Sequence, residues 1–309
     1  MLVLAPRYLL PNSSFLSPRI IDLTGDICST NLPNISSSAF NLKFRRKAAP
    51  SLQYVQDTLV FCNLETVSNP GSKICIGIKR SSNSWVALPP QLDDGGIQSS
   101  VVVNDSILMI RYRAPVASVR INQAGVDMKG YIGDYHGGCP LYDQPNNRVI
   151  FINKGKVRVL DFTGKVPTST VLTNNLMVRT HSGCDFVKLG GKRSLVVAGG
   201  VSYYASKEDT ATTSTTVEFI AVEDLLDGEP RYLPPLSLFH ARKPAVTQVG
   251  THIFVIGGLR NNQELKRAGG KFIEKWDEQS WAVQQFREEH YYSQFDAHSV
   301  FLPKLFCEQ

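Results

Sequence analysis

The sequence lacks the long apolar runs and the short catalytic motifs that would assign it quickly to a common class. No stretch approaches the roughly 20 consecutive apolar residues of a membrane-spanning helix, and its most apolar runs have the length of β-strands. It contains no phosphate-binding loop, no G-x-S-x-G, no H-E-x-x-H and no C-x-x-C. We therefore expect no membrane span, and no motif indicates a nucleotide, serine-hydrolase or zinc site.

Concentrated charge is also scarce. The net charge of +6 is spread along the 309 residues, apart from a brief basic cluster at Lys43, Arg45, Arg46 and Lys47. Nucleic-acid-binding proteins gather such charge on one face, so we expect no nucleic-acid partner. The opening MLVLAPRYLLPNSS has no basic start, and Pro6 interrupts its apolar run, which is untypical of a signal peptide. With 42% hydrophobic and 19% charged residues, the composition indicates a soluble globular protein.

A degenerate repeat runs through the whole chain. An apolar run that ends in a glycine pair, or in residues that replace it, recurs at steps of roughly 42 to 58 residues, close to the period of four-stranded propeller blades. More polar extended segments such as RIIDLTG and STTVEFIAV follow most copies. The six copies are MLVLAP (1–6), TLVFCN (58–63), SILMIRY (106–112), RVIFIN (148–153), SLVVAGG (194–200) and HIFVIGG (252–258).

This pattern predicts an all-β, six-bladed β-propeller in a single domain, 1–309. The chain starts within an apolar run and ends with FDAHSVFLPKLFCEQ, which reads as a first strand without its apolar successor. A propeller leaves no open sheet edge, so we expect the last blade to combine strands from both termini. Residues 221–226 are the only helical turn expected. The predicted blades are approximately 36–90, 91–135, 136–178, 179–236, 237–286, and 287–309 plus 1–35.

The repeat resembles that of the kelch family. Gly199-Gly200 and Gly257-Gly258, the latter followed by Trp281, match the kelch pattern of an apolar run, a glycine pair and a later tryptophan. In the other copies Ala5-Pro6, Asn63-Leu64, Arg111-Tyr112 and Asn153-Lys154 replace the glycines. The cysteines in LVFCN and KICIG, followed by SNSWVALPP, resemble a kelch unit of invertebrate extracellular proteins, as do IIDLTGDICSTNLPN and the GGCPLY to RTHSGCDFV succession. The resemblance implies a propeller that acts by binding.

Six cysteines allow fifteen pairings, and the expected fold ranks them. Cys62 and Cys75 would lie on neighbouring strands of one blade, and Cys139 and Cys184 would begin the innermost strands of adjacent blades. Cys28 and Cys307 remain, and a bond between them would fasten the blade built from both ends. Six free thiols in a cytosolic protein are the alternative, and a zinc site is disfavoured by the spacing. Disulfides would place the protein outside the cell.

Other candidate sites are less specific. Asn12, Asn34 and Asn104 begin N-x-S/T sequons and are candidate glycosylation sites, although chance explains as many. Histidines stand near the starts of predicted innermost strands, where they could form a metal-binding ring or simply pack against loops. They are His136, His181, His240 and either His290 or His298. Asp93-Asp94 and Glu288-Glu289 are acid pairs in predicted loops, where solvated charge is the usual role. We assign no catalytic residue, metal or cofactor, and a copper site of the galactose oxidase type finds no matching residues.

We therefore expect a non-catalytic binding module, extracellular and monomeric, with a protein or glycan partner. Function in propellers sits in loops on a rigid scaffold. Two candidate loops are the insert YYASKEDTATTST (203–215), which could also be a disordered hairpin tip, and the basic LRNNQELKRAGG (259–270). An intracellular kelch adaptor is the main alternative, and a propeller enzyme of the oxidase type is a third.

Overall fold

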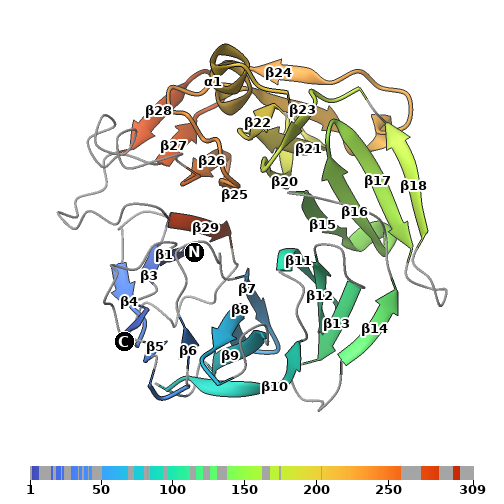
Figure 1. Cartoon of the computed structure of the whole chain (residues 1–309). Coiled ribbons are helices and arrows are strands. Elements are labelled where there is room, and N and C mark those ends of the chain that lie inside the picture. Colours follow the sequence, from blue (N-terminus) through green and yellow to red (C-terminus); the bar gives the residue numbers. More distant parts are fainter. Residues whose placement is uncertain are drawn as a thin grey trace. The chain divides into compact units, whose positions relative to one another are not determined.

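The chain forms two compact units of β-sheets in the computed structural model (Figure 1). Unit 1 comprises Met1–Asp134, Phe162–Thr168 and His298–Gln309, and unit 2 comprises Tyr135–Asp161 and Ser169–Ala297. The predicted single-domain boundary, 1–309, stays a prediction. The structure describes residues 2–6, 15–16, 19–21, 23, 29–33, 35–36, 38–40, 42–43, 51–68, 73–79, 82, 84–92, 97–111, 116–120, 126–130, 138–161, 168–173, 175–202, 204–258, 273–284 and 295–299.

Unit 2 contains three antiparallel four-stranded sheets, each a meander along the chain. Their first strands, β15, β20 and β25, lie next to one another in that order, and apolar clusters fill the space between successive sheets. This stacking of meanders is the arrangement of propeller blades. The strands are β15 (Cys139–Asp143), β16 (Arg148–Asn153), β17 (Lys156–Asp161) and β18 (Thr168–Thr173); β20 (Gly183–Leu189), β21 (Lys192–Ala198), β23 (Val217–Ala221) and β24 (Arg231–Leu233); and β25 (Ala245–Val249), β26 (His252–Ile256), β27 (Ile273–Trp276) and β28 (Trp281–Gln284).

Unit 1 contains two further sheets of this kind. One has the order β10-β9-β8-β6, with β7 also paired to β8, and the next has the order β11-β12-β13-β14. Apolar residues from both sheets, including Val60 and Met109, form one buried cluster. The strands are β6 (Leu42–Lys43), β7 (Ser51–Val55), β8 (Thr58–Thr66), β9 (Lys73–Lys79) and β10 (Val86–Leu92), then β11 (Ile97–Val103), β12 (Ser106–Arg111), β13 (Val116–Arg120) and β14 (Val126–Gly130).

Strands from both ends of the chain form a sixth sheet, ordered β29-β1-β3-β4. Its strands are β29 (Phe295–Ser299), β1 (Leu2–Pro6), β3 (Arg19–Ile21) and β4 (Ser29–Asn31). The short strands β2 (Phe15–Leu16) and β5 (Ile35–Ser36) pair separately, as do β19 (Arg179–Thr180) and β22 (Val201–Ser202). Each of the five other large sheets comes from one continuous segment of the chain, whereas the sixth sheet combines strands from both ends. Among the described residues the fold thus supports five blades, whereas six were predicted, because the sixth sheet is assembled from short strands that are far apart in the sequence.

The glycine pairs end strands where the following segment passes unusually close. Gly199 and Gly200 have φ of 65° and 93°, and Gly257 and Gly258 have φ of 70° and 69°, values that favour glycine. The Gly200 amide donates to the His240 carbonyl (2.8 Å), and a Cβ on Gly200 would lie 2.7 Å from the Thr180 carbonyl oxygen. The pair is therefore both a backbone turn and a contact surface for the next blade.

One segment predicted as a loop or a disordered hairpin tip is a helix. Helix α1 (Lys207–Thr215) lies within the 203–215 insert. Ser206 caps it: its hydroxyl accepts from the Asp209 amide, and the Asp209 carboxylate accepts from the Ser206 amide. This reciprocal capping box explains why a Ser/Thr-rich segment with no apolar face is helical. At the predicted helical turn, 221–226, the structure has a 3₁₀ turn, η2 (Val222–Asp224).

Candidate functional site

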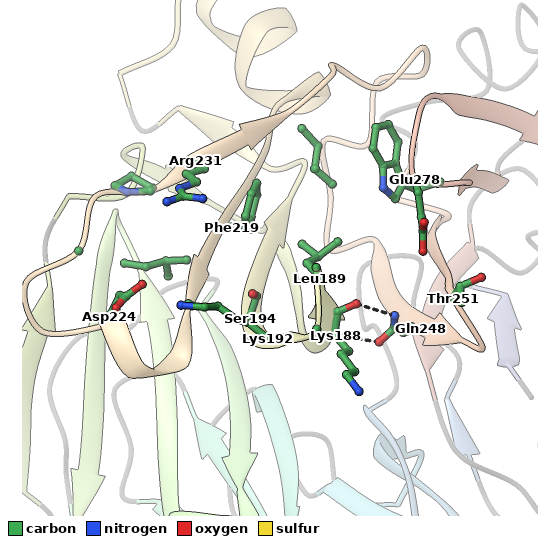
Figure 2. A pocket seen from close by; sticks show the side chains of 18 of the residues that line it. Lys188, Leu189, Lys192, Ser194, Phe219, Asp224, Arg231, Gln248, Thr251 and Glu278 are labelled. Carbon is green, nitrogen blue, oxygen red and sulfur yellow. Dashed lines mark hydrogen bonds between the residues drawn. The ribbon is translucent and has the colours of Figure 1, made fainter.

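A groove of about 1090 Å³ lies between the β20–β24 and β25–β28 sheets, both in unit 2 (Figure 2). Two hairpin turns, Gly190-Gly191 and Gly250-Thr251, form part of its wall. Its other lining residues come from β20, β21, β23, β24, β25 and β27, from η2 and the loop after it, and from the turn after β27. The lining residues are Lys188, Leu189, Gly190, Gly191, Lys192, Ser194, Phe219, Ile220, Ala221, Asp224, Gly228, Glu229, Pro230, Arg231, Leu233, Gln248, Gly250, Thr251, Trp276 and Glu278.

The floor of the groove is apolar and firmly held. Phe219, Leu233 and Trp276 belong to the buried cluster shared by the two sheets. The Trp276 ring lies 5.4 Å from that of Trp281, whose indole N–H donates to the Pro234 carbonyl at 2.8 Å. Because these rings are fixed by packing and by a hydrogen bond, the floor is preformed rather than assembled on binding.

Two side-chain-to-backbone hydrogen bonds tie the walls together. The Lys188 amide donates to Gln248 Oε1 (2.7 Å), and Gln248 Nε2 donates to the Lys188 carbonyl (3.0 Å), as Figure 2 shows. Gln248 thus joins β25 to β20 as a backbone partner would. The two walls cannot separate at this end without breaking both bonds.

Exposed charges of both signs surround the apolar floor. Lys192 pairs with Glu223 at 3.0 Å near the edge of the groove, and Glu229 accepts a hydrogen bond from Asn175 at 3.1 Å. The pKa of Lys192 is raised by its hydrogen bond to Glu223, which also lowers the pKa of that carboxyl. An apolar centre with a mixed polar rim is the chemistry of a protein interface. The exposed charged lining residues are Lys188, Lys192, Asp224, Glu229, Arg231 and Glu278.

Two buried carboxylates, each bonded to a basic side chain, support the sheets on either side of the groove. Glu218 on β23 accepts from Arg179 and from the Met177 amide (2.8 Å). In the next sheet, Glu274 on β27 accepts from His240 (3.2 Å) and from the Ser237 and Leu238 amides (both 2.8 Å).

Burial and hydrogen bonding shift the pKa values of these groups in opposite directions. Burial raises the pKa of Glu274, but the hydrogen bonds and charge of His240 and the two amides outweigh it, so the pKa lies below its ordinary value. Burial lowers the pKa of Arg179, and the negative charge of Glu218 opposes that effect. These carboxylates are fully used by structural partners, so their role is support.

Four of the six cysteines lie at disulfide-bonding distance in the predicted pairs. The sulfurs of Cys62 and Cys75 are 1.99 Å apart, across β8 and β9, and those of Cys139 and Cys184 are 1.96 Å apart, across β15 and β20. The second pair links neighbouring blades of unit 2. Cys28 and Cys307 lie outside the described residues, and their pairing stays a prediction.

The remaining candidate sites divide between structural roles and undescribed residues. His240 is buried, with its Nδ1 2.5 Å from the Gly257 carbonyl oxygen, and His181 contacts the Thr180 hydroxyl at 3.1 Å. Asn104 is exposed at the β11–β12 turn, with φ of 52°. The other candidates lie outside the described residues: Asn12, Asn34, His136, His290, Asp93-Asp94, Glu288-Glu289 and the 259–270 loop. The backbone of His298 is described, but its side chain is not. Within the described residues, no cluster of three His, Cys, Asp or Glu suits a metal ion, and no helix could cross a membrane.

No family model matches the chain, and no curated protein matches it. Solved structures do. The chain is similar to the structure of YjhT, with 14% identity and a TM-score of 0.57 over 88% of this chain and 91% of that one. It is also similar to a putative 6-phosphogluconolactonase from Bacteroides uniformis, with 10% identity and a TM-score of 0.50 over 91% of this chain and 81% of that one. The fold is a β-propeller.

Sequence reasoning missed the groove. Its residues come from turns and strand ends separated by up to 90 positions, from Lys188 to Glu278. The available signals were the glycines of the two turns and Trp276, which ends the strand after the second glycine pair. Neither identifies a groove until the blades are placed side by side.

Proposed function

We propose that this protein is a non-catalytic binding module whose groove between the β20–β24 and β25–β28 sheets takes an extended segment of a partner protein. The single observation that carries this proposal is the groove itself: a preformed apolar floor inside a rim of exposed charges of both signs. A peptide offers apolar side chains, backbone amides and charges of both signs, and so matches each of these features. A glycan partner is the alternative, because the same rim offers hydrogen-bonding groups.

We also propose a sixth blade, built from both termini, in addition to the five described, and the kelch type that the repeat predicts. The support for this closure is the sheet order β29-β1-β3-β4, which places the C-terminal strand beside the N-terminal one. The glycine pairs with positive φ, and Trp281 after the second pair, support the kelch type. A bond between Cys28 and Cys307 would fasten such a blade. We propose that the protein is a monomer.

We further propose an extracellular location. The two cysteine pairs at bonding distance favour an oxidising compartment. Asn104 stands exposed on the two-residue turn between β11 and β12, a position that suits a glycan. A cytoplasmic adaptor is the competing proposal, and it requires both pairs to be reduced in the cell.

The test of the groove is a steric block at one turn with a matched block elsewhere. Thr251→Trp places a large side chain at the exposed β25–β26 turn in the groove wall. Asp105→Trp places the same side chain at the corresponding β11–β12 turn and leaves the Asn104 sequon intact. Peptides selected on the wild-type protein from a displayed random library should bind Asp105→Trp as before and lose at least tenfold affinity for Thr251→Trp.

Equal binding to the two variants would overturn the groove as the site. A glycan array probed with the same three proteins tests the alternative partner: glycan binding lost only in Thr251→Trp would replace the peptide by a sugar. An enzyme remains the third reading, since one similar structure is named a putative 6-phosphogluconolactonase. Turnover of 6-phosphogluconolactone, or a stoichiometric bound metal with oxidase activity, would contradict a non-catalytic role.

A further inference from the structure

A second, smaller cavity of about 470 Å³ lies between the β15–β18 and β20–β24 sheets of unit 2. It shares no lining residue with the groove. One end is polar and cationic, with Arg148, Arg193 and Asn146, while much of the remainder is apolar. Its volume is within the range of small-molecule sites, roughly 300–1,000 Å³.

The cationic end is built around one buried carboxylate. Asp143 is fully buried and accepts from Arg148 Nε (2.7 Å), Arg193 Nη1 (2.5 Å) and Asn146 Nδ2 (2.8 Å). Burial raises the pKa of Asp143, but these hydrogen bonds outweigh it and hold the pKa below its ordinary value, so the carboxylate stays ionised. Two guanidinium groups therefore share a single negative charge, which leaves a net positive charge at this end of the cavity.

The two arginines are fixed and still have donors to offer. Each guanidinium uses one N–H for Asp143, and the side chains of Arg148 and Arg193 are 28% and 35% exposed. The Arg193 guanidinium carbon also lies 4.0 Å from the centroid of the Phe186 ring, which holds its plane in place. Because an arginine carries five N–H donors, both can bind a second anion without releasing Asp143.

The opposite wall is apolar, and its one acid is already paired. Val222, Leu225 and Leu226 line this side with Leu172, and the Leu226 side chain is 64% exposed. Glu223 also lines the cavity, but Lys192 holds it at 3.0 Å and offsets its charge. A ligand that fits both ends is therefore an anion with an apolar body.

We propose that this cavity binds a small carboxylate with an aliphatic body: the carboxylate on Arg148 and Arg193, the aliphatic part against Leu172, Val222 and Leu226. Planar carboxylates suit guanidinium donors. The chemistry is shared by a free short-chain carboxylic acid and by the C-terminal carboxylate of a peptide that ends in an aliphatic residue. This site is independent of the groove and does not rest on the function proposed for it.

Calorimetric titration of the intact protein with hexanoate tests the proposal, with hexan-1-ol and acetate as probes that each lack one half of the ligand. We expect saturable millimolar binding of hexanoate and at least tenfold weaker binding of both other probes. Acetyl-Ala-Leu and its C-terminal amide distinguish the two sources of the carboxylate. If acetyl-Ala-Leu binds and its amide does not, a peptide C-terminus is a second acceptable ligand. If neither binds, the site is restricted to short-chain carboxylic acids.

Variants locate the binding. Leu226→Glu removes an exposed apolar contact and adds a repelling charge, and Arg148→Gln removes one donor group; each should weaken hexanoate at least tenfold. Val86→Glu makes the same kind of change at a 44% exposed position on β10 and should leave the affinity unchanged. The proposal is wrong if hexan-1-ol binds as tightly as hexanoate, if hexanoate does not bind, or if Leu226→Glu binds as wild type does.

Discussion

Two buried acids in unit 2, Glu218 and Glu274, each connect a blade to the segment that precedes it. Glu218 and Glu274 lie opposite Val197 and Val255 of the preceding strands. Each accepts hydrogen bonds from a basic side chain and from backbone N–H groups of the segment ahead of its blade: one N–H for Glu218 and two for Glu274. In the sequence each is one acid in an apolar strand, VEFIA or IEKW, and looks like an exposed residue. Their importance follows only from burial.

Glu218→Gln should therefore cost far more stability than the same change at the surface. The substitution leaves Arg179 buried without its counter-charge, which typically costs about 3–5 kcal/mol. Urea unfolding measures the loss. Glu223→Gln removes an exposed ion pair with Lys192 and should have no measurable effect. Equal losses for the two variants would show that the buried pair is not what holds the segment.

Asp185 on β20 gives a distinct pH dependence. Burial raises the pKa of its carboxyl to about 7, well above the value of about 3.9 expected for the unfolded chain. The folded state therefore holds a proton that the unfolded state loses between about pH 4 and pH 7, so stability falls as pH rises through that window and is constant above it.

Asp185→Asn should remove this loss, and Asn Oδ1 can still accept from the Phe186 amide as Asp185 does at 2.8 Å. The difference in melting temperature between variant and wild type should grow from near zero at pH 4 to several degrees above pH 7. Asp143 and Glu274, whose pKa values are lowered, act in the opposite direction below about pH 4 in both proteins. A difference independent of pH would refute the assignment.

Strands were easier to predict than their ends. The described residues of the apolar runs, 58–63, 106–111, 148–153, 194–200 and 252–258, all lie in second strands or in the glycine pair that follows them, because a buried strand needs apolar residues on both faces. The sequence did not indicate that a residue other than glycine could adopt the same backbone conformation at the strand end. Lys154 takes the place of Gly200, adopts φ of 51° and donates to the Arg179 carbonyl at 3.2 Å, as Gly200 does to that of His240. Helix α1 was not predicted because its Ser/Thr-rich sequence has no apolar residues at helical spacing.

The glycine pair can be tested by comparing two glycines with positive φ. Gly190 and Gly200 have φ of 54° and 93°, so alanine strains the backbone at either position, by about 1–2 kcal/mol. A Cβ on Gly190 would meet nothing within 4 Å, whereas on Gly200 it would lie 2.7 Å from the Thr180 carbonyl oxygen. Gly200→Ala should therefore lower the unfolding free energy more than Gly190→Ala, by at least about 1 kcal/mol. Equal losses would limit the role of the pair to backbone conformation.

At the scale of the whole molecule, the periodicity of the sequence predicted the class of fold but not the two cavities proposed as binding sites. The repeat could be read because every blade buries the same strand. The groove and the Arg148-Arg193 cavity could not, because each joins turns and strand ends of neighbouring blades that no repeat brings together. The cysteine pairs could be predicted in part. The possible pairings could be ranked once blades were assumed, since Cys139 and Cys184 lie at the starts of the first strands of neighbouring blades.

The cysteine pairs give the most direct test of the proposed propeller, because each pair depends on which strands are neighbours. Cys139 and Cys184 close a segment of 45 residues between adjacent blades, worth roughly 4 kcal/mol in the chain-entropy model, and Cys62 and Cys75 close 13 residues, worth roughly 3 kcal/mol. A bond between Cys28 and Cys307 would join the two ends of the proposed closing blade.

Peptide mapping of the natively produced protein, alkylated without reduction, measures all three pairs at once. The account of an extracellular propeller closed by both termini predicts three linked peptide pairs: Cys62 with Cys75, Cys139 with Cys184, and Cys28 with Cys307. Six alkylated thiols, or a bond that joins Cys62 or Cys75 to any other cysteine, would contradict it.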